Sequence, residues 1–283
     1  LALLALSSAT TIPPAHRDPQ DVPKEVTLDM SPSSFDDRYA GCARAMTAAL
    51  PSLNHSEFLL NADYASAWAL ATAEWHVRGS PRPPRSPLSP PQAIALLAYT
   101  APLPLHRAFN AASRVAGRSR LHYLDQFHFK ALHFLLSDAL GVLRGSRGSG
   151  CHRVFRGVRG VRFVARVGRT VRFGHFASAS RRGESARSFG SDSLFEVQTC
   201  HGAAIRDFSF FPDEDEVLIP PFEAFEVTNV TNGTNGINGT GGTGGTGGTG
   251  GVRIWLRSVG TLSNYNCEWV RGEGTWGAPL GRG

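Results

Sequence analysis

The spacing of apolar residues predicts helices in the first half of the chain. Three stretches repeat apolar residues every three or four positions, which is the spacing of one helix face. They cover residues 56–78, which stop before the breaker run GSPRPPRSPLSPP, residues 90–101, with prolines in the first turn, and residues 121–144. We therefore predict that residues 36–146 form a mainly helical part.

From Cys151 onward the pattern changes to short β-type segments separated by glycine and proline. These segments are CHRVFRGV, RFVARVG, TVRFGHFASAS, SLFEVQTC, EVLIPPFEAFEVTNV and VRIWLRSVG. Helices followed by strands are typical of an α+β fold. We predict a helical N-terminal part that packs on a two-sheet β core formed by residues 151–272.

The two ends of the chain carry the features from which we predict export of the protein from the cell. Residues 1–15, LALLALSSATTIPPA, resemble the remnant of a secretory signal peptide and are too short to span a bilayer. A buried N-terminal helix is the alternative. Residues 273–283 carry no apolar tail and are expected to be disordered. We expect a secreted protein, with a lipid anchor only if the chain continues past residue 283.

A Gly/Thr-rich insertion separates the last two predicted strands. Residues 231–251 consist largely of glycine and threonine repeats, which cannot bury apolar surface. We predict a flexible loop at a hairpin tip, where a long insertion costs little free energy.

Composition fits a globular, exported protein. The 283 residues are 41% hydrophobic and 18% charged, enough for a substantial core. The four cysteines form no CxxC pair, which argues against zinc or dithiol chemistry and for disulfides, and their spacing leaves all three pairings open. Sequons predict a glycoprotein, at Asn54, Asn229, Asn232 and Asn238.

The net charge of +6 comes almost entirely from arginine. Nine arginines lie between Arg144 and Arg172, a density that gives affinity for phosphate and raises a nucleic-acid-binding function as an alternative. The secretory start argues against it, and strand alternation would leave most of these side chains in solvent. We therefore expect no nucleic-acid partner.

Four consecutive acids, residues 213–216, adjoin the apolar run VLIPP. Adjacent carboxylates repel one another and lose hydration near a core, so the arrangement costs stability. In an extended segment Glu214 and Glu216 would share one face and could do separate jobs, one orienting a nucleophile and one stabilising a cation. A solvated turn is the alternative.

Two further segments carry groups suited to binding a phosphorylated ligand. Arg156 lies within an otherwise apolar predicted strand, where its planar guanidinium needs an anion such as phosphate. Gly157 would let a ligand approach the backbone closely. Ser178 and Ser180 would share one face of a later strand and offer hydroxyl groups.

In this order, Arg156, Ser178-Ala179-Ser180 and Glu214-Asp215-Glu216 resemble the R–S–ExE signature of the arginine-specific mono-ADP-ribosyltransferases of vertebrates, in their secreted or cell-surface branch. Stretches such as SFDDRYAGC, FKALHFLLSDAL and LRSVGTLSNYNCEWV extend the resemblance over residues 33–272, except the Gly/Thr insertion. The resemblance implies a central NAD cleft between the helical part and the β core, NAD or NADP as the substrate, no metal, and a monomer.

The resemblance also implies a role for each site residue. Arg156 would hold the NAD diphosphate, Ser178 the nicotinamide-ribose end, and Glu216 the ribose 2′-hydroxyl. Glu214 would engage the acceptor guanidinium. Further contacts with NAD are expected from Tyr99, Ser209 and His175, the last standing where relatives carry Gln, and from Phe189, stacked on nicotinamide. The implied disulfides are Cys42–Cys267 and Cys151–Cys200.

The implied reaction transfers ADP-ribose from NAD to arginine side chains of extracellular proteins, or to small guanidino compounds, and releases nicotinamide. Cleavage of the nicotinamide–ribose bond leaves an oxocarbenium-like sugar, which a nearby carboxylate stabilises. Two alternatives remain open. Water could replace arginine as the acceptor, making the protein an NAD glycohydrolase, or the chain could be a secreted binding glycoprotein without activity.

Overall fold

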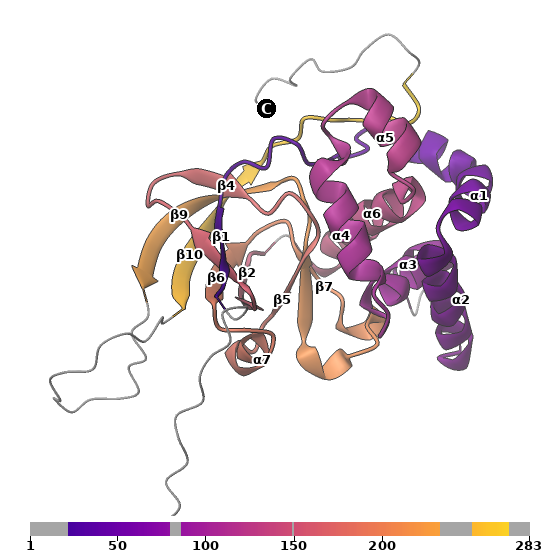
Figure 1. Cartoon of the computed structure of the whole chain (residues 1–283). Coiled ribbons are helices and arrows are strands. Elements are labelled where there is room, and N and C mark those ends of the chain that lie inside the picture. The colour runs from indigo at the N-terminus through magenta and orange to yellow at the C-terminus, as the bar shows by residue number, and fades with distance from the viewer. Residues whose placement is uncertain (1–21, 80–85, 149, 233–250, 272–283) are drawn as a thin grey trace, which may run out of the picture.

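The computed structural model describes residues 22–79, 86–148, 150–232 and 251–271. The segments expected at 1–15 and 273–283, and nearly all of the 231–251 insertion, lie outside the described residues. Helices occupy one side of the molecule and a large sheet the other (Figure 1). This arrangement confirms the predicted α+β fold.

The helical side consists of α1 (Ala43–Leu60), α2 (Ala62–Val77), α3 (Pro90–Thr100), α4 (Leu105–Ala116), α5 (Arg120–Gln126) and α6 (Lys130–Arg147). The prediction of one helix over 56–78 is wrong, because the backbone is extended at Asn61. The Asn61 side chain accepts a hydrogen bond from the backbone N–H of Tyr64 at 3.0 Å and thereby begins α2.

The predicted helix over 121–144 is also interrupted. α5 ends at Gln126 and α6 begins at Lys130, while the rings of Phe127 and Phe129 between them are buried. The carboxylate of Glu57, on α1, accepts hydrogen bonds from the backbone N–H groups of Lys130 at 2.7 Å and Ala131 at 3.0 Å. A side chain distant in sequence therefore satisfies the first turn of α6.

The sheet contains β2 (His152–Val158), β4 (Thr170–Arg172), β5 (Ala177–Ser180), β6 (Ser193–Thr199), β7 (Ala203–Ala204), β8 (Glu216–Ile219), β9 (Glu223–Asn232) and β10 (Val252–Thr261). Its order is β4-β9-β10-β6-β2-β5-β8-β7, with β10 parallel to β6 and the other neighbours antiparallel. β1 (Lys24–Thr27) and β3 (Val161–Val164) form a separate parallel pair, and α7 (Gly183–Ser188) follows β5.

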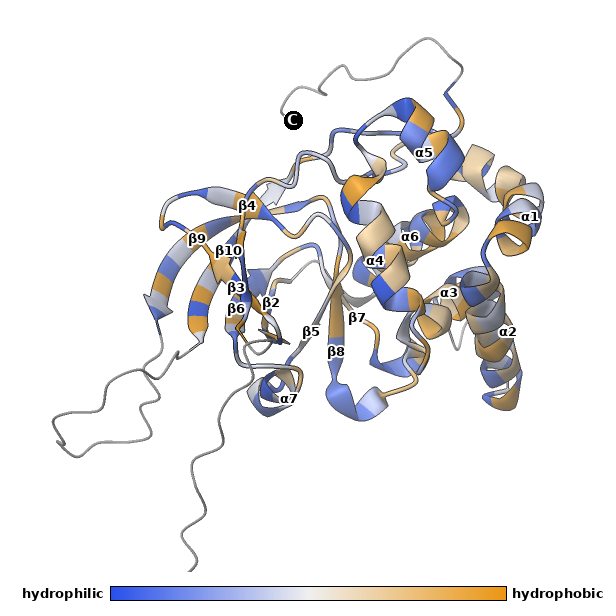
Figure 2. Cartoon of the chain, in the orientation of Figure 1, coloured by the Kyte–Doolittle hydropathy of each residue, from blue (hydrophilic) through white to orange (hydrophobic). Residues whose placement is uncertain are grey.

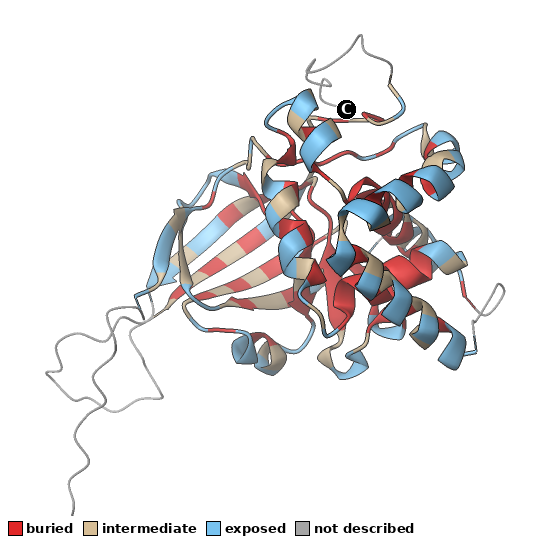
Figure 3. Ribbon diagram, turned by 45° about the vertical axis from the view of Figure 1, so that its right-hand side comes forward, coloured by how far each residue is buried: buried red, intermediate tan, exposed pale blue. Residues whose placement is uncertain are grey.

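Two apolar cores support these layers. One lies among the helices and includes residues 93–99 of α3, all of which are buried. The other lies on one face of the sheet, and buried residues alternate with less buried ones along its strands (Figure 3). The same alternation separates apolar from polar residues along β9 and β10 (Figure 2). Near the end of α3 the Tyr99 hydroxyl donates to the carbonyl oxygen of Phe176, just before β5, at 3.0 Å.

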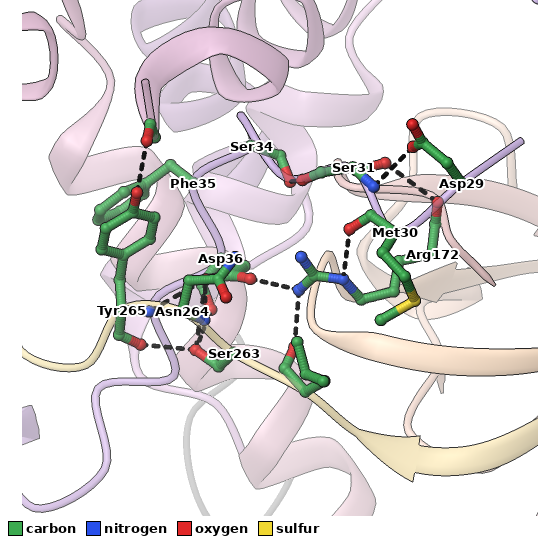
Figure 4. A network of polar contacts seen from close by, with 12 residues as sticks. Asp29, Met30, Ser31, Ser34, Phe35, Asp36, Arg172, Ser263, Asn264 and Tyr265 are labelled. Carbon is green, nitrogen blue, oxygen red and sulfur yellow. Dashed lines mark hydrogen bonds and ion pairs between the residues drawn. The ribbon is translucent and has the colours of Figure 1, made fainter. Parts of the chain in front are cut away.

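Both expected disulfides, Cys42–Cys267 and Cys151–Cys200, are formed. Near the first of them, a buried polar network joins the N-terminal segment, β4 and the C-terminal segment (Figure 4). The guanidinium of Arg172, 1% exposed, pairs with Asp36 and donates to the carbonyl oxygens of Met30 at 2.9 Å and Leu262 at 2.7 Å. Asp36 also accepts hydrogen bonds from the backbone N–H groups of Asn264 and Tyr265, which hold the C-terminal segment against the N-terminal one.

Candidate active site

A cavity of about 920 Å³ lies between the α3–α4 connection and strands β2, β5 and β8. It opens where the sheet is loosest, since β2 and β5 share only the residue pair Phe155–Ser180 in the described sheet. Six of the eight predicted site residues line it: Tyr99, Arg156, Ser178, Phe189, Glu214 and Glu216. Segments that are distant in sequence therefore converge as the motif predicts.

Arg156 bridges the two strands that border the cavity. Its Nη1 donates a hydrogen bond to the carbonyl oxygen of Ser178 on β5 at 2.6 Å. Burial lowers the pKa of this guanidinium from its ordinary high value, while Tyr99 and Glu216 act in the opposite direction. The result is a positive charge held in a partly desolvated position, which is suited to an anionic ligand.

Gly157 lines the cavity and also lies directly against α7. A Cβ at this position would lie 2.0 Å from the carbonyl oxygen of Ala186 and 2.5 Å from that of Gly190. The close approach of α7 and the turn after it therefore requires glycine here, and the approach of a ligand to the Gly157 backbone stays a prediction. Only glycine allows α7 to pack against β2 at this point.

Glu216 is the first residue of β8 and is only 6% exposed. Burial raises the pKa of its carboxyl group to about 7, and the neighbouring Glu214 adds to this effect. Hydrogen bonds from the Ser178 and Ser209 side chains and the charge of Arg156 oppose it. A carboxylate desolvated in this way interacts strongly with positive charge that develops beside it.

Residues 213–215 form a turn, which was the alternative to an extended segment with Glu214 and Glu216 on one face. Pro212–Glu214 form a 3₁₀ turn, Asp215 has the left-handed backbone angle φ 46°, and only Glu216 begins the strand. Ser180 secures this turn, because its hydroxyl donates to the carbonyl oxygen of Glu214 and accepts from the backbone N–H of Arg182 at 2.9 Å. Glu214 and Glu216 nevertheless both line the cavity, and burial raises the pKa of Glu214.

Two predicted ligands of NAD lie behind the cavity wall. Ser209 is buried and touches the site through its hydrogen bond to Glu216. His175 is buried too, with Nδ1 2.6 Å from the carbonyl oxygen of Phe173 and Nε2 3.4 Å from Nη2 of Arg114. Burial and the charges of Arg114 and Arg156 lower the pKa of His175 well below its ordinary value, so the ring is neutral.

The structure adds residues that the motif did not identify. His106, Arg107 and Asn110 of α4 and the half-exposed Phe211 also line the cavity. Nδ2 of Asn110 donates to the Tyr99 hydroxyl at 3.1 Å, whereas its buried Oδ1 has no hydrogen-bond partner within the described chain. No sequence signal marked α4, because the face that a helix turns to a cavity is set by its docking.

Over the described ranges, no three His, Cys, Asp or Glu side chains are placed to hold a metal ion. Nor does any helix in those ranges combine the length and apolar character needed to cross a bilayer.

Comparison with known proteins finds relatives that match most of the chain. Residues 28–238 match the family model described as ART, NAD:arginine ADP-ribosyltransferase. The chain is 50% identical over 256 residues to GPI-linked NAD(P)(+)–arginine ADP-ribosyltransferase 1 of Mus musculus, covering 88% of this chain and 74% of that protein. It is 48% identical over 271 residues to the erythroblast NAD(P)(+)–arginine ADP-ribosyltransferase of Gallus gallus, covering 96% and 85%.

Solved structures show the same fold. The crystal structure of the eukaryotic mono-ADP-ribosyltransferase ART2.2 superposes with a TM-score of 0.69 at 35% identity, covering 86% of this chain and 98% of that one. A variant of ART2.2 in complex with NAD gives a TM-score of 0.68 at 34% identity, with the same coverage. The chain belongs to the NAD:arginine ADP-ribosyltransferase family.

Proposed function

We propose that this protein transfers ADP-ribose from NAD to the guanidinium of arginine side chains and releases nicotinamide. The observation that carries the proposal is the convergence of Arg156, Ser178, Glu214 and Glu216 in one cavity large enough for a dinucleotide. The catalytic set is complete, which favours an active enzyme over an inactive binding glycoprotein.

Two groups prepare NAD for cleavage. Arg156 binds the diphosphate, because a partly desolvated guanidinium interacts more strongly with phosphate than one in water. Ser178 holds the nicotinamide ribose, with its hydroxyl beside Glu216. The ionised carboxylate of Glu216 then stabilises the positive charge that develops on the ribose as nicotinamide departs.

Glu214 binds the guanidinium of the acceptor arginine. Arginine is protonated in solution and therefore a poor nucleophile. Glu214 pairs with the guanidinium, orients one nitrogen toward the ribose C1, and takes the proton that is lost as the bond forms. Phe189 and Phe211, 50% and 44% exposed, also line the cavity. Phe189 stacks on nicotinamide, and Phe211 offers an aromatic face to the acceptor guanidinium.

The deciding experiment uses purified protein, labelled NAD and agmatine, a small guanidino compound. Labelled agmatine with release of nicotinamide supports the transferase. Free ADP-ribose alone supports the NAD glycohydrolase, and neither product supports the binding glycoprotein.

Glu214→Gln should separate transfer from hydrolysis. Loss of the negative charge removes the partner of the guanidinium, so transfer to agmatine should fall at least about tenfold more than NAD hydrolysis does. Both products are measured in the same reaction. Asp213→Asn, at the exposed neighbouring position, should leave both rates near wild type. Equal losses of transfer and hydrolysis would contradict the role of Glu214.

The pH dependence of kcat/KM should report the ionisation of Glu216. Because burial raises its pKa to about 7, the active ionised form is lost below that pH and kcat/KM should fall toward tenfold per pH unit. Ser178→Ala removes a hydrogen bond that lowers this pKa, so the acid limb should move to higher pH. A flat profile between pH 5 and 8 would show that ionised Glu216 is not needed.

Asn110→Leu should weaken NAD binding. The unpaired Oδ1 of Asn110 is placed to accept a hydrogen bond from NAD, and one such bond is worth about 1 kcal/mol, or roughly fivefold in KM. Ser113→Ala, on the same helix with a hydroxyl bonded to the Phe109 carbonyl oxygen, is the matched control for helix packing. A KM for NAD equal in the two variants would contradict this contact.

We also propose that the enzyme works outside the cell on exposed arginines of extracellular proteins. Two disulfides and relatives named as GPI-linked support an extracellular location. Secretion and surface anchoring are distinguished by expressing the gene in cultured cells and measuring activity in medium and on intact cells. Activity confined to the cytosol would contradict the proposal.

A further inference from the structure

A side chain at the end of α2 is bonded to the segment that leads to Glu214. Arg78 is the residue that follows the last turn of α2. Its Nη2 donates a hydrogen bond to the carbonyl oxygen of Ser209 at 3.0 Å, and its Nη1 donates to that of Asp207 at 3.4 Å. We call residues 207–214 the acceptor loop. Arg78 therefore joins the helical part of the molecule to the start of this loop.

Two further contacts fix the direction of the Arg78 guanidinium. Its Nε donates to the carboxylate of Glu74, one turn earlier on α2, at 2.6 Å. The guanidinium carbon lies 6.0 Å from the ring centroid of Phe210, in the acceptor loop. α2 is itself anchored by Trp75, which is buried in the helical core. Because Glu74 takes Nε, the two terminal nitrogens of the planar fork remain for the loop carbonyl groups.

Hydrogen bonds within the acceptor loop connect Ser209 to both glutamates of the motif. The Ser209 hydroxyl donates to Glu216 and accepts from the backbone N–H of Phe211 at 3.0 Å. The carbonyl oxygen of Phe211 accepts in turn from the backbone N–H of Glu214 at 3.1 Å. The position of Ser209 therefore affects Glu216 directly and Glu214 through one intervening residue.

The two ends of the acceptor loop are held by different parts of the fold. At its last residue, the Ser180 hydroxyl on β5 donates to the carbonyl oxygen of Glu214. At its start, Thr100 Oγ1 on α3 accepts from the backbone N–H of Phe210 at 3.2 Å. Arg78 acts at this helical end together with Thr100. Loss of the Arg78 contacts would leave the sheet end attached while the start of the loop gains freedom.

We propose that Arg78 is a positioning residue for ADP-ribose transfer, and that it holds the acceptor loop where Glu214 meets the acceptor guanidinium. This inference rests on the proposed function of Glu214. Arg78 does not line the catalytic cavity, so it acts through the loop and not by contact with NAD or the acceptor. Arg156 and Ser178 lie on strands that Arg78 does not touch, so binding of NAD should depend on it much less.

The first test compares the two substrates in Arg78→Met, which keeps an unbranched side chain and removes the donors. The KM for agmatine should rise about five- to tenfold, because two hydrogen bonds that position Glu214 are lost. The KM for NAD should change by less than about twofold. Labelled NAD, with agmatine and NAD varied in turn, gives both constants. An unchanged KM for agmatine, or equal increases in both constants, would overturn the proposal.

Arg120→Met is the matched control. Arg120 lies outside the cavity, pairs with Glu268 at 2.6 Å and donates to the carbonyl oxygen of Arg271 at 3.3 Å, so it too joins one carboxylate to a backbone carbonyl. Its partner Glu268 is buried, whereas Glu74 is partly exposed. Arg120→Met should therefore lower Tm at least as much as Arg78→Met does. Its KM for agmatine should nevertheless stay within about twofold of wild type.

Arg78→Lys tests the need for the planar fork. An ammonium group can donate to one loop carbonyl but does not reproduce the geometry with which the guanidinium also binds Glu74. The KM for agmatine should therefore lie between those of wild type and Arg78→Met. If Arg78→Met folds poorly, Arg78→Lys replaces it in both measurements, and a wild-type KM for agmatine in that variant would overturn the proposal.

Backbone hydrogen exchange tests the positioning without reference to activity. Peptides that cover residues 205–216 should exchange about five- to tenfold faster in Arg78→Met than in wild type, and at the wild-type rate in Arg120→Met. Unchanged exchange in these peptides would overturn the proposal even if transfer falls. A faster-exchanging loop in a protein whose wild type forms no ADP-ribosyl agmatine would instead contradict the proposed function, and would leave Arg78 with a structural role only.

Discussion

Glu216→Gln should reduce kcat for ADP-ribose transfer and for NAD hydrolysis by about 10²–10³ or more, while the fold is retained. Both reactions develop the same positive charge on the ribose, so both should lose the same stabilisation. Labelled NAD with and without agmatine measures the two rates. Glu226→Gln, a carboxylate on β9 paired with Arg257, is the matched control and should leave both rates unchanged.

Stability measurements distinguish this loss from unfolding. Because burial raises the pKa of Glu216, the folded state favours the protonated carboxyl, and ionisation costs stability as pH rises from the unfolded value of about 4.5 through about 7. At pH 8 the neutral glutamine should therefore make the variant at least as stable as wild type. A variant that retains full activity, or that loses activity only because it unfolds, would contradict the catalytic role.

Arg172→Met should lower the free energy of unfolding by about 3–5 kcal/mol, because it leaves the buried carboxylate of Asp36 without its charged partner. It also removes two donors to backbone carbonyl oxygens, those of Met30 and Leu262. Urea unfolding with the disulfides intact measures the loss.

Two further variants test whether the loss of stability in Arg172→Met comes from breaking the buried ion pair. Arg257→Met breaks an ion pair in which the Arg257 side chain is 58% exposed, so it should cost no more than about 1 kcal/mol. The double variant Asp36→Leu with Arg172→Met removes both charges and should recover part of the stability. If Arg172→Met costs no more than Arg257→Met, the buried pair does not hold the C-terminal segment as the geometry indicates.

Arg172 and Glu216 are both buried charged side chains, but they differ in how well their charge is paired. The Arg172 guanidinium donates to acceptors from two segments, Met30 and Asp36 in the N-terminal segment and Leu262 in the C-terminal one, and its charge is paired with the Asp36 carboxylate. Glu216 is buried with hydroxyl donors but also beside a second carboxylate, so its charge is held at a cost. The first arrangement serves the fold, and the second becomes useful only when a cationic sugar forms beside it.

The amino-acid sequence by itself determined the types of element, the order of helices before strands, and the residues of the R–S–ExE motif. Local patterns are enough to predict these features, because apolar periodicity depends on neighbouring residues and the motif is defined by the order of its residues along the chain. The disulfide partners came from resemblance to a family and not from spacing, which left three pairings open.

Only the tertiary structure decided where the helices and strands begin and end, and which groups surround the site residues. α6 begins at Lys130 because Glu57, on another helix, supplies its first hydrogen-bond acceptors. The turn at Asp215 depends on Ser180, and Asn110 reaches the cavity only through the docking of α4. The raised pKa of Glu216 likewise arises from burial. Each is a contact between segments distant in sequence, and such contacts leave no periodic or local signal in the chain.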